Sequence, residues 1–515
     1  MLARGAARHC WRPAQFSRRE ETAIKQHEAA EHHKKAAEHR EHAAAHHREA
    51  AAESHGGKGT NRHTAGDPAE NDICVSSPRL AGAVRILLEP SAGHYRNAGD
   101  SAMLQVAYRR LRELWPSACI YVITSEPEGL SHYCPGAIAL PMSDRNTALR
   151  EPSITSRLGR LLPERVSAQL EEFECASWQQ FPKLRLAALK WRKNVEVEGA
   201  AACLDVLSRC DLVVATGAGK ITDAFAYEAA LTLNVLREAK RHGIPAAMLG
   251  QGIGPISNPA LLARCRRVLP RVNIIALREA RTGPALLKTL GVSTDRMSVT
   301  GDDAIESAYT LCPEKLGSAL GFNLREARYA GTGIAQATWL RRVVQEGAAE
   351  FHAPLAGILI SRDPESSEAI IQHVLDGHPN ILPTNPDLDP VENAIRQAGL
   401  CRVVLAGSYH SAVFALSQGV SVVGLVNSPY YAAKFEGLEA QFGSGCRHVM
   451  LEEPGAPETL HRAIRSAWET AVENRPRLLD AAARQIGLAQ KVYERIRDLV
   501  MRSRERVMEA ASVSG

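Results

Sequence analysis

Residues 212–223 read LVVATGAGKITD, and this stretch contains the pattern that decides the fold. Its first four residues form a continuous apolar run, which predicts a strand buried on both faces, and a glycine-rich turn follows directly. Similar runs recur between amphipathic helical segments at 84–88, 120–124, 246–249, 272–277, 319–324, 355–360, 403–406 and 420–426. Apolar strands that alternate with helices predict parallel sheets covered by helices on both faces.

The apolar runs fall into two series, one ending near Val299 and the other beginning near Ala319. We therefore expect an α/β fold with two doubly wound parallel-sheet (Rossmann-like) domains that face a cleft. The expected divisions are an Ala/His-rich heptad extension and linker at 1–75, an N-terminal domain at 80–315 with a helical insertion at 145–200, a C-terminal domain at 316–450 and C-terminal helices at 455–510.

Composition excludes several classes of protein. With 45% apolar residues in a chain of 515, wholesale disorder is excluded. The net charge of +5 is too small to predict a nucleic-acid partner. No apolar stretch approaches the ~20 residues of a membrane helix, so we expect a cytoplasmic protein without a transmembrane segment; peripheral membrane association stays open. Eleven cysteines without a CxxC pair predict reduced, mostly buried thiols.

The segment 20–55 differs in composition from the rest of the chain. A pair of alanines recurs every seven residues, which predicts a helical or disordered extension with a heptad pattern. His32, His39 and His46 repeat at the same spacing and would share one helix face. The interpretations are a solvated helix, an arm for self-association, or a transition-metal site, and the Ala-rich charged composition favours the first two.

Ligands of doubly wound sheets bind beyond the carboxyl ends of the strands, so the loops there are candidate sites. The loop 91–100 follows the first apolar run and contains Asn97, Gly99 and Asp100. Asn97 and Asp100 can cap the helix that begins there and form the turn, or Asp100, His94 or Arg96 can face the cleft.

Two glycine-rich loops follow later strands. The loop 216–223 does not match a nucleotide-binding P-loop, because that motif needs GxxxxGK followed by Ser or Thr. A short turn in which Gly217 and Gly219 bring backbone N–H groups close to a ligand remains. The loop 250–255, with Gln251 and Gly252, allows a similarly close backbone approach.

Charged residues also lie at the ends of predicted strands. Arg278 ends the run 272–277, where its guanidinium could bind a carboxylate or a phosphate, and Arg281 follows it. Asp302 and Asp303 are adjacent acids after another strand; helix capping is favoured there over a metal site, and no metal ion is expected.

In the second series, Arg325 follows the opening strand, and Ser408, Tyr409 and His410 stand between a strand and a helix. A histidine in this position is suited to proton transfer near neutral pH. Lys434 lies in an aromatic segment, which is either an apolar cover or a wall of the cleft.

Seven short segments taken together resemble the polysaccharide pyruvyl transferase family. They are Asn97-x-Gly99-Asp100, Thr216-Gly-Ala-Gly219, Gly250-Gln-Gly-Ile-Gly-Pro255, Arg278-Glu, Leu290-Gly-Val292, Thr300-Gly-Asp302 and Tyr409-His410-Ser-Ala-Val-Phe-Ala415. The resemblance covers about residues 85–440 and implies a two-domain fold similar to glycosyltransferase type B. It also implies transfer of the enolpyruvyl unit of phosphoenolpyruvate to sugar hydroxyls of a surface polysaccharide or a lipid-linked precursor, commonly as a cyclic ketal.

The resemblance implies that Arg278 holds the phosphoenolpyruvate carboxylate or phosphate with His410 beside it. Many members carry Arg where this chain has Ser408, so Arg325, Lys434 or Arg281 would have to supply the missing positive charge. We hypothesise that His410 delivers a proton or stabilises the departing phosphate, while Asp100 accepts the proton of the sugar hydroxyl. This scheme needs no metal or organic cofactor.

Two other functions stay open from the sequence. A nucleotide-sugar glycosyltransferase would use the same cleft, and the adjacent acids at 302–303 favour it slightly. A non-catalytic glycan-binding or assembly protein is favoured by Ser408 and by the heptad segment.

Overall fold

The computed structural model describes residues 82–149, 198–324, 334–362, 368–385 and 387–514. The chain divides into two units, Met1–Asn71 and Asp72–Gly515. The first unit, with the predicted heptad segment and its histidines, lies outside the described residues, and so does most of the predicted insertion at 145–200. The second unit is described here.

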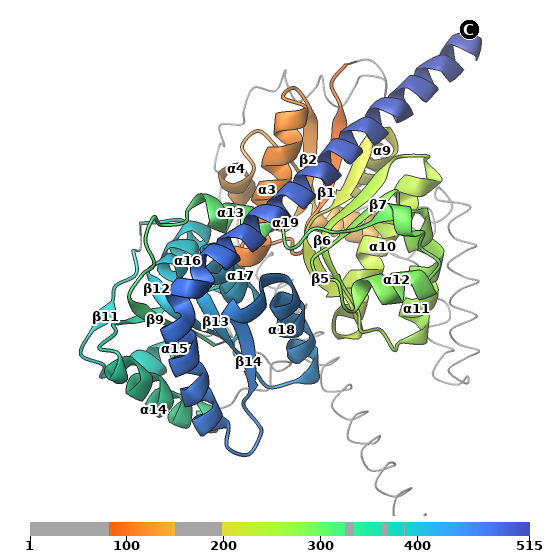
Figure 1. The fold of residues 1–515 in the computed structure, drawn as a ribbon. Coiled ribbons are helices and arrows are strands. Elements are labelled where there is room, and N and C mark those ends of the chain that lie inside the picture. Colours follow the sequence, from red (N-terminus) through yellow and green to blue (C-terminus); the bar gives the residue numbers. More distant parts are fainter. Residues whose placement is uncertain (1–81, 150–197, 325–333, 363–367, 386, 515) are drawn as a thin grey trace, which may run out of the picture. The chain divides into compact units, whose positions relative to one another are not determined.

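Two parallel sheets form the second unit (Figure 1), which confirms the predicted α/β fold class. The first sheet has the order β3-β2-β1-β4-β6-β7-β8, with β5 paired to β6. The second has the order β11-β10-β9-β12-β13-β14. In each sheet, successive strands are added first on one side and then on the other. The change of side falls between β1 and β4 in the first sheet and between β9 and β12 in the second. Ligands of such sheets bind at these places.

The strands of the first sheet are β1 (Arg85–Glu89), β2 (Cys119–Thr124), β3 (Ile138–Pro141), β4 (Leu212–Ala215), β5 (Ala218–Ile221), β6 (Ala246–Ile253), β7 (Ile274–Leu277) and β8 (Met297–Val299). The strands of the second are β9 (Ala319–Asn323), β10 (Leu355–Gly357), β11 (Ile381–Leu382), β12 (Cys401–Ala406), β13 (Ser421–Val426) and β14 (Cys446–Met450).

The α-helices follow the strands in alternation. They are α3 (Ala98–Leu114), α4 (Pro127–Tyr133), α5 (Met142–Leu149), α9 (Glu198–Arg209), α10 (Ala226–Arg241), α11 (Pro259–Val268), α12 (Gly283–Thr289), α13 (Ala304–Thr310), α14 (Ile334–Glu350), α15 (Glu368–Leu375), α16 (Pro390–Gly399), α17 (Tyr409–Ser417), α18 (Pro429–Phe442) and α19 (Ala456–Ser514).

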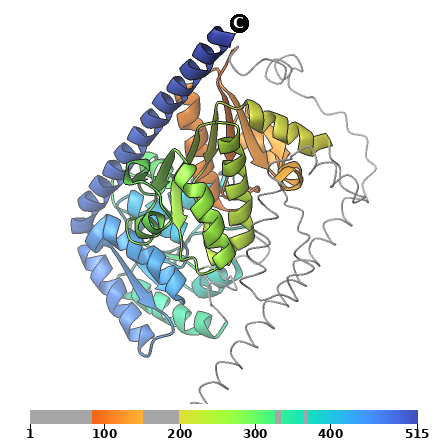
Figure 2. The same ribbon diagram turned by 90° about the vertical axis from the view of Figure 1, so that its right-hand side faces the viewer.

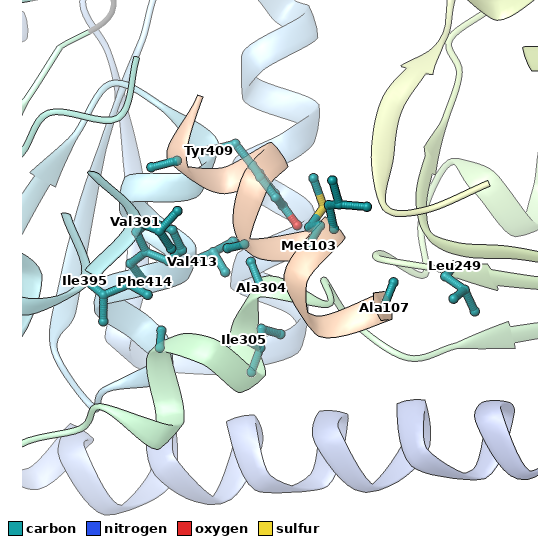
Figure 3. Packing of buried hydrophobic residues seen from close by; sticks show 14 of the residues in the cluster. Met103, Ala107, Leu249, Ala304, Ile305, Val391, Ile395, Tyr409, Val413 and Phe414 are labelled. Carbon is teal, nitrogen blue, oxygen red and sulfur yellow. The ribbon is translucent and has the colours of Figure 1, made fainter. Parts of the chain in front are cut away.

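Successive strand residues point to opposite faces of the first sheet and enter different cores. Leu87 and Val213 pack with α9, α10 and α11 on one face, whereas Leu88 and Val214 pack with α3 on the other. The second face shares its core with α13, α16 and α17, so one apolar cluster runs from the first sheet to the second (Figure 3). This shared core fixes the two sets of strand ends relative to each other.

Helix α19 runs along both sheets as one long helix (Figures 1 and 2). It contacts β7 and α13 of the first half and β12, β13 and β14 of the second. Its apolar side is buried at Leu478, Val492 and Ile496, while its other side is charged. Among the described helices, even this one has no stretch apolar enough to cross a membrane.

Three local predictions are wrong. The glycine loop 216–223 contains a short strand, β5, because Ala218 and Ile221 pair with β6. Strand β10 ends at Gly357 rather than at 360, since the chain turns there and Ile360 O instead accepts a hydrogen bond from Ala98 N at 2.8 Å. Cys119 is disulfide-bonded, whereas a reduced thiol was expected. Disulfide pairing depends on proximity in the fold, which spacing along the chain does not reveal. The other described cysteines are free thiols.

Candidate active site

Arg278 follows β7 directly and brings a buried guanidinium to the carboxyl end of the first sheet. Its Cζ lies 4.2 Å from the centroid of the Tyr409 ring, a cation–π arrangement. Tyr409 is the first residue of α17, which follows β12 of the second sheet. The two sheets therefore meet through this pair of side chains.

Glycines leave the room that the Arg278 side chain occupies. A Cβ atom added at Gly219 would lie 2.5 Å from its Nη2, and one added at Gly252 would lie 2.6 Å from its Nε. Atoms at these distances overlap. Gly219 lies in β5 and Gly252 lies in β6, which continues to Ile253, so the prediction that both belong to loops is wrong. These two strand glycines leave the space that the guanidinium occupies.

Asp302 stands between Arg278 and His410. Its Oδ2 is 3.9 Å from Nη1 of Arg278 and 3.8 Å from Nε2 of His410. Both distances are longer than a hydrogen bond but short enough for strong charge interaction in a buried setting. Oδ1 accepts a hydrogen bond from Ala304 N at 2.9 Å, at the start of α13. Asp302 therefore links a cation of the first sheet to the histidine of the second.

Burial raises the pKa of Asp302 to about 6, although the Arg278 charge and the Ala304 N–H lower it in part. The negative charge of Asp100 adds to the rise in the pKa of Asp302. Asp100 follows Gly99, against which the His410 ring packs. The neighbouring Asp303 is buried as well, and burial raises its pKa well above the ordinary range of a carboxyl. Its side chain does not cap α13, but that of Asp302 does.

The N-terminus of α3 lies against His410. A Cβ atom added at Gly99 would be 2.0 Å from Cγ of the imidazole, so the ring rests on the glycine. Asn97, rather than Asp100, caps the helix: its Oδ1 accepts hydrogen bonds from the N–H groups of Gly99 and Asp100. The capping interpretation is therefore confirmed for Asn97 and wrong for Asp100, because an N-cap side chain must precede the helix and Asp100 lies in its first turn.

Ser408 is the N-cap of α17 and is buried. Its Oγ accepts a hydrogen bond from Ser411 N at 3.3 Å, and its N–H donates to Oδ1 of Asn323 at 2.9 Å. Asn323 ends β9, so the start of α17 is tied to the neighbouring strand. Ser408 is occupied with holding this turn and brings no positive charge to the site.

The remaining predicted residues divide into two groups. Lys434 of α18 lines the same pocket as Arg278, Gly219 and Gly252, and its Nζ lies 4.2 Å from the centroid of the Tyr430 ring. Gly217 and Gln251 are buried under the pocket: a Cβ at Gly217 would meet Sδ of Met103, and Nε2 of Gln251 donates to Thr216 O at 2.6 Å.

The sequence suggested two further cations, Arg325 and Arg281. Arg325 lies outside the described residues. Arg281 is half exposed and its Nη2 lies 3.0 Å from Oε2 of Glu436. Arg96, an alternative in the loop before α3, pairs at the surface with Glu126, with Nη2 3.4 Å from Oε1.

Sequence reasoning missed the central position of Asp302 and the burial of Lys220. Asp302 was assigned to helix capping, which it performs with one oxygen while the other faces the two cations. A signal was present, since Thr300-Gly-Asp302 follows a strand at the same edge as Arg278. Among the described residues, no group of three His, Cys, Asp or Glu side chains is arranged to hold a metal ion.

A family model for polysaccharide pyruvyl transferases matches residues 97–429, which include the loops described above from Asn97 to the start of α18. The chain belongs to the polysaccharide pyruvyl transferase family. Membership in this transferase family confirms the resemblance drawn from the seven motifs. The matched region includes strands of both sheets, and Arg278, Asp302 and His410 all lie within it.

Other comparisons are more distant. No curated protein sequence matches this pyruvyl transferase family member. Among solved structures, UDP-GlcNAc 2-epimerase from Neisseria meningitidis bound to UDP-GlcNAc is 13% identical with a TM-score of 0.47, covering 81% of this chain and 99% of that chain. A glycosyltransferase from Rickettsia africae is 11% identical with a TM-score of 0.45, covering 82% and 99%.

Proposed function

We propose that this chain transfers the pyruvyl unit of phosphoenolpyruvate to the hydroxyls of a sugar in a polysaccharide or a glycan precursor, forming a ketal. The observation that supports this proposal is the array Arg278–Asp302–His410, in which a buried cation and a histidine from different sheets meet at one carboxylate. Such an array offers a cation that can bind an anion and, next to it, a group that can donate a proton. The reaction of an enol phosphate requires both.

In the proposed binding mode, Arg278 holds the carboxylate or the phosphate of the donor. Phosphoenolpyruvate carries up to three negative charges, so a second cation is expected. Lys434 is the best candidate among the described residues that line the pocket, because Ser408 is neutral and Arg281 is engaged with Glu436. The N–H groups of the glycine loops would add further hydrogen bonds.

In the proposed reaction, His410 as imidazolium donates a proton to the methylene carbon of phosphoenolpyruvate, and the central carbon becomes electrophilic. A sugar hydroxyl oxygen then bonds to that carbon and loses its proton to Asp100. A second hydroxyl of the same sugar displaces phosphate from the carbon and closes the ring. The two sugar hydroxyls lose two protons in total. One proton makes up for the proton that the new methyl group gained, and the other leaves with inorganic phosphate.

Titration calorimetry distinguishes phosphoenolpyruvate as the donor from the donor of a nucleotide-sugar glycosyltransferase. We expect heat of binding with phosphoenolpyruvate, lost in Arg278→Ala, and none with a panel of nucleotide sugars. Binding of a nucleotide sugar that survives in Arg278→Ala, together with no binding of phosphoenolpyruvate, would overturn the proposed donor. Circular dichroism of the variant checks that the fold is intact.

A further inference from the structure

Lys220 is a buried cation whose ammonium group holds the backbone of another loop. It lies in β5 next to Gly219, but neighbouring strand residues point to opposite sides, so Gly219 faces Arg278 while Lys220 faces away from it. Its Nζ donates to Pro90 O at 2.8 Å and to Ser91 O at 3.2 Å. These are the first two residues after β1, at the start of the loop that leads to Asn97, Gly99 and Asp100.

Two positively charged side chains, Lys220 and Arg145, lie next to one carboxylate. Glu89, the last residue of β1, lies with its Oε1 3.5 Å from Nζ of Lys220 and 3.4 Å from Nη2 of Arg145. The hydroxyl of Thr232 also donates to this oxygen at 3.0 Å. Two cations thus share one buried carboxylate, and all three side chains are nearly inaccessible to solvent.

Asp100 supplies a further negative charge. Burial lowers the pKa of Lys220, while the charges of Glu89 and Asp100 raise it and that of Arg145 lowers it again. The negative charge of Asp100 therefore favours the charged form of Lys220. Hydrogen bonds to two carbonyl oxygens alone would not need an ammonium group. Burial of an ammonium group costs free energy unless a negative charge accompanies it.

We propose that Lys220 is a positioning residue for the transfer reaction, which fixes the start of the loop 90–97 and thereby the place of Asp100. This inference rests on the proposed function, because it assigns to Asp100 the role of proton acceptor. Lys220 touches neither of the pocket residues Arg278 and Lys434 in the arrangement described above, so its removal should affect catalysis rather than donor binding.

The test compares Lys220→Met with Lys240→Met. Lys240 is a matched control, since its Nζ also bonds to two oxygen atoms, Ile244 O at 3.2 Å and Asn273 Oδ1 at 2.8 Å, at the far end of α10. Lys220→Met leaves Glu89 paired with Arg145, so the buried carboxylate keeps a cation and the variant should fold. Lys220→Arg keeps the charge and tests rescue.

We expect Lys220→Met to lower kcat by up to about 100-fold, the size of effect that misplacing a reacting group by about 1 Å can produce. The KM for phosphoenolpyruvate should change by less than about threefold, and Lys220→Arg should recover part of the lost kcat. Lys240→Met should leave both constants unchanged. An unaltered kcat in a folded Lys220→Met variant, or a loss that appears only in KM, would overturn the inference.

Hydrogen exchange gives a second readout that needs no activity. We expect the amides of 91–101 to exchange faster in Lys220→Met than in the parent or in Lys240→Met. Equal exchange would overturn the positioning role. If the parent protein transfers no pyruvyl group, the proposed function fails, but the exchange experiment still decides whether Lys220 fixes the loop.

Discussion

The imidazole of His410 occupies the space that Gly99 leaves empty. A Cβ atom at position 99 would lie 2.0 Å from Cγ of the ring and 2.1 Å from its Nδ1. Gly99 belongs to α3 of the first sheet and His410 to α17 of the second, so this contact sets how closely the two halves of the site approach.

Gly99→Ala should therefore displace His410 and lower kcat by at least about tenfold, because a small shift of a proton donor is costly in rate. Helix α3 itself should tolerate alanine, which favours helices more than glycine does. Steady-state kinetics checks the rate. The control is Gly487→Ala in α19, where no atom lies within 4 Å of the new Cβ, and it should keep full activity.

Gly252→Ala should raise the KM for phosphoenolpyruvate, by about tenfold or more, because its Cβ would overlap Nε of Arg278 and push the guanidinium away. The matched variant is Gly217→Ala. There the new Cβ would overlap the buried side chain of Met103 and not Arg278, so KM should stay near its original value in the folded variant. Equal KM values in both variants would contradict the assignment of Arg278 to donor binding.

Lys434→Met tests the second cation of the pocket. We expect KM for phosphoenolpyruvate to rise about tenfold, which corresponds to about 1.4 kcal/mol and to the loss of one charge-assisted hydrogen bond. Arg281→Met is the control, since Arg281 is exposed and paired with Glu436, and its KM should not change. If Arg281→Met raised KM and Lys434→Met did not, the two roles would have to be exchanged.

The raised pKa of Asp302 predicts a dependence of stability on pH. A carboxyl with a pKa of about 6 in the folded chain and about 3.8 when unfolded binds its proton more tightly in the folded state. Its contribution to the free energy of unfolding is therefore greatest below pH 4 and is lost as the pH rises to about 6. The loss amounts to at most about 3 kcal/mol, at about 1.4 kcal/mol for each unit of pKa.

Asp302→Asn should lack this loss, so its stability relative to the parent should increase between pH 4 and pH 7. Urea unfolding at several pH values measures the difference. Asp295→Asn is the comparison: a hydrogen bond from Ser293 lowers the pKa of this exposed carboxyl, so its effect should have the opposite sign and fall below about pH 4, with little change between pH 4 and pH 7. A constant difference between parent and Asp302→Asn across this range would show that Asp302 does not titrate as described.

The main strands could be predicted from sequence because strands buried on both faces are continuous apolar runs. The run 212–215 coincides with β4, and the run at 420–426 differs from β13 by one residue. The edge strands β11 and β14 escaped prediction. Strand β11 has only two residues, and β14 carries Arg447 and His448, so neither produces a long apolar signal.

The site could be predicted only in part. The predicted strand ends indicated Arg278 and His410 as site residues, because the carboxyl ends of parallel strands lie at one edge of the sheet. Asp302 also follows a strand of the first sheet, so its place near Arg278 could have been predicted. Its contact with His410 could not, because it depends on how α17 packs against the first sheet. The direction of Lys220 was also hidden, because a glycine-rich segment gave no sign that it forms a strand with two distinct faces.

Release of inorganic phosphate from phosphoenolpyruvate, measured across a panel of glycan acceptors, tests the proposed function most directly. We expect release that depends on the acceptor and matches the amount of ketal formed, and we expect it to vanish in His410→Ala while circular dichroism shows an intact fold. Unchanged release in a folded His410→Ala variant, or no release by the parent protein with any acceptor, would contradict the proposed reaction.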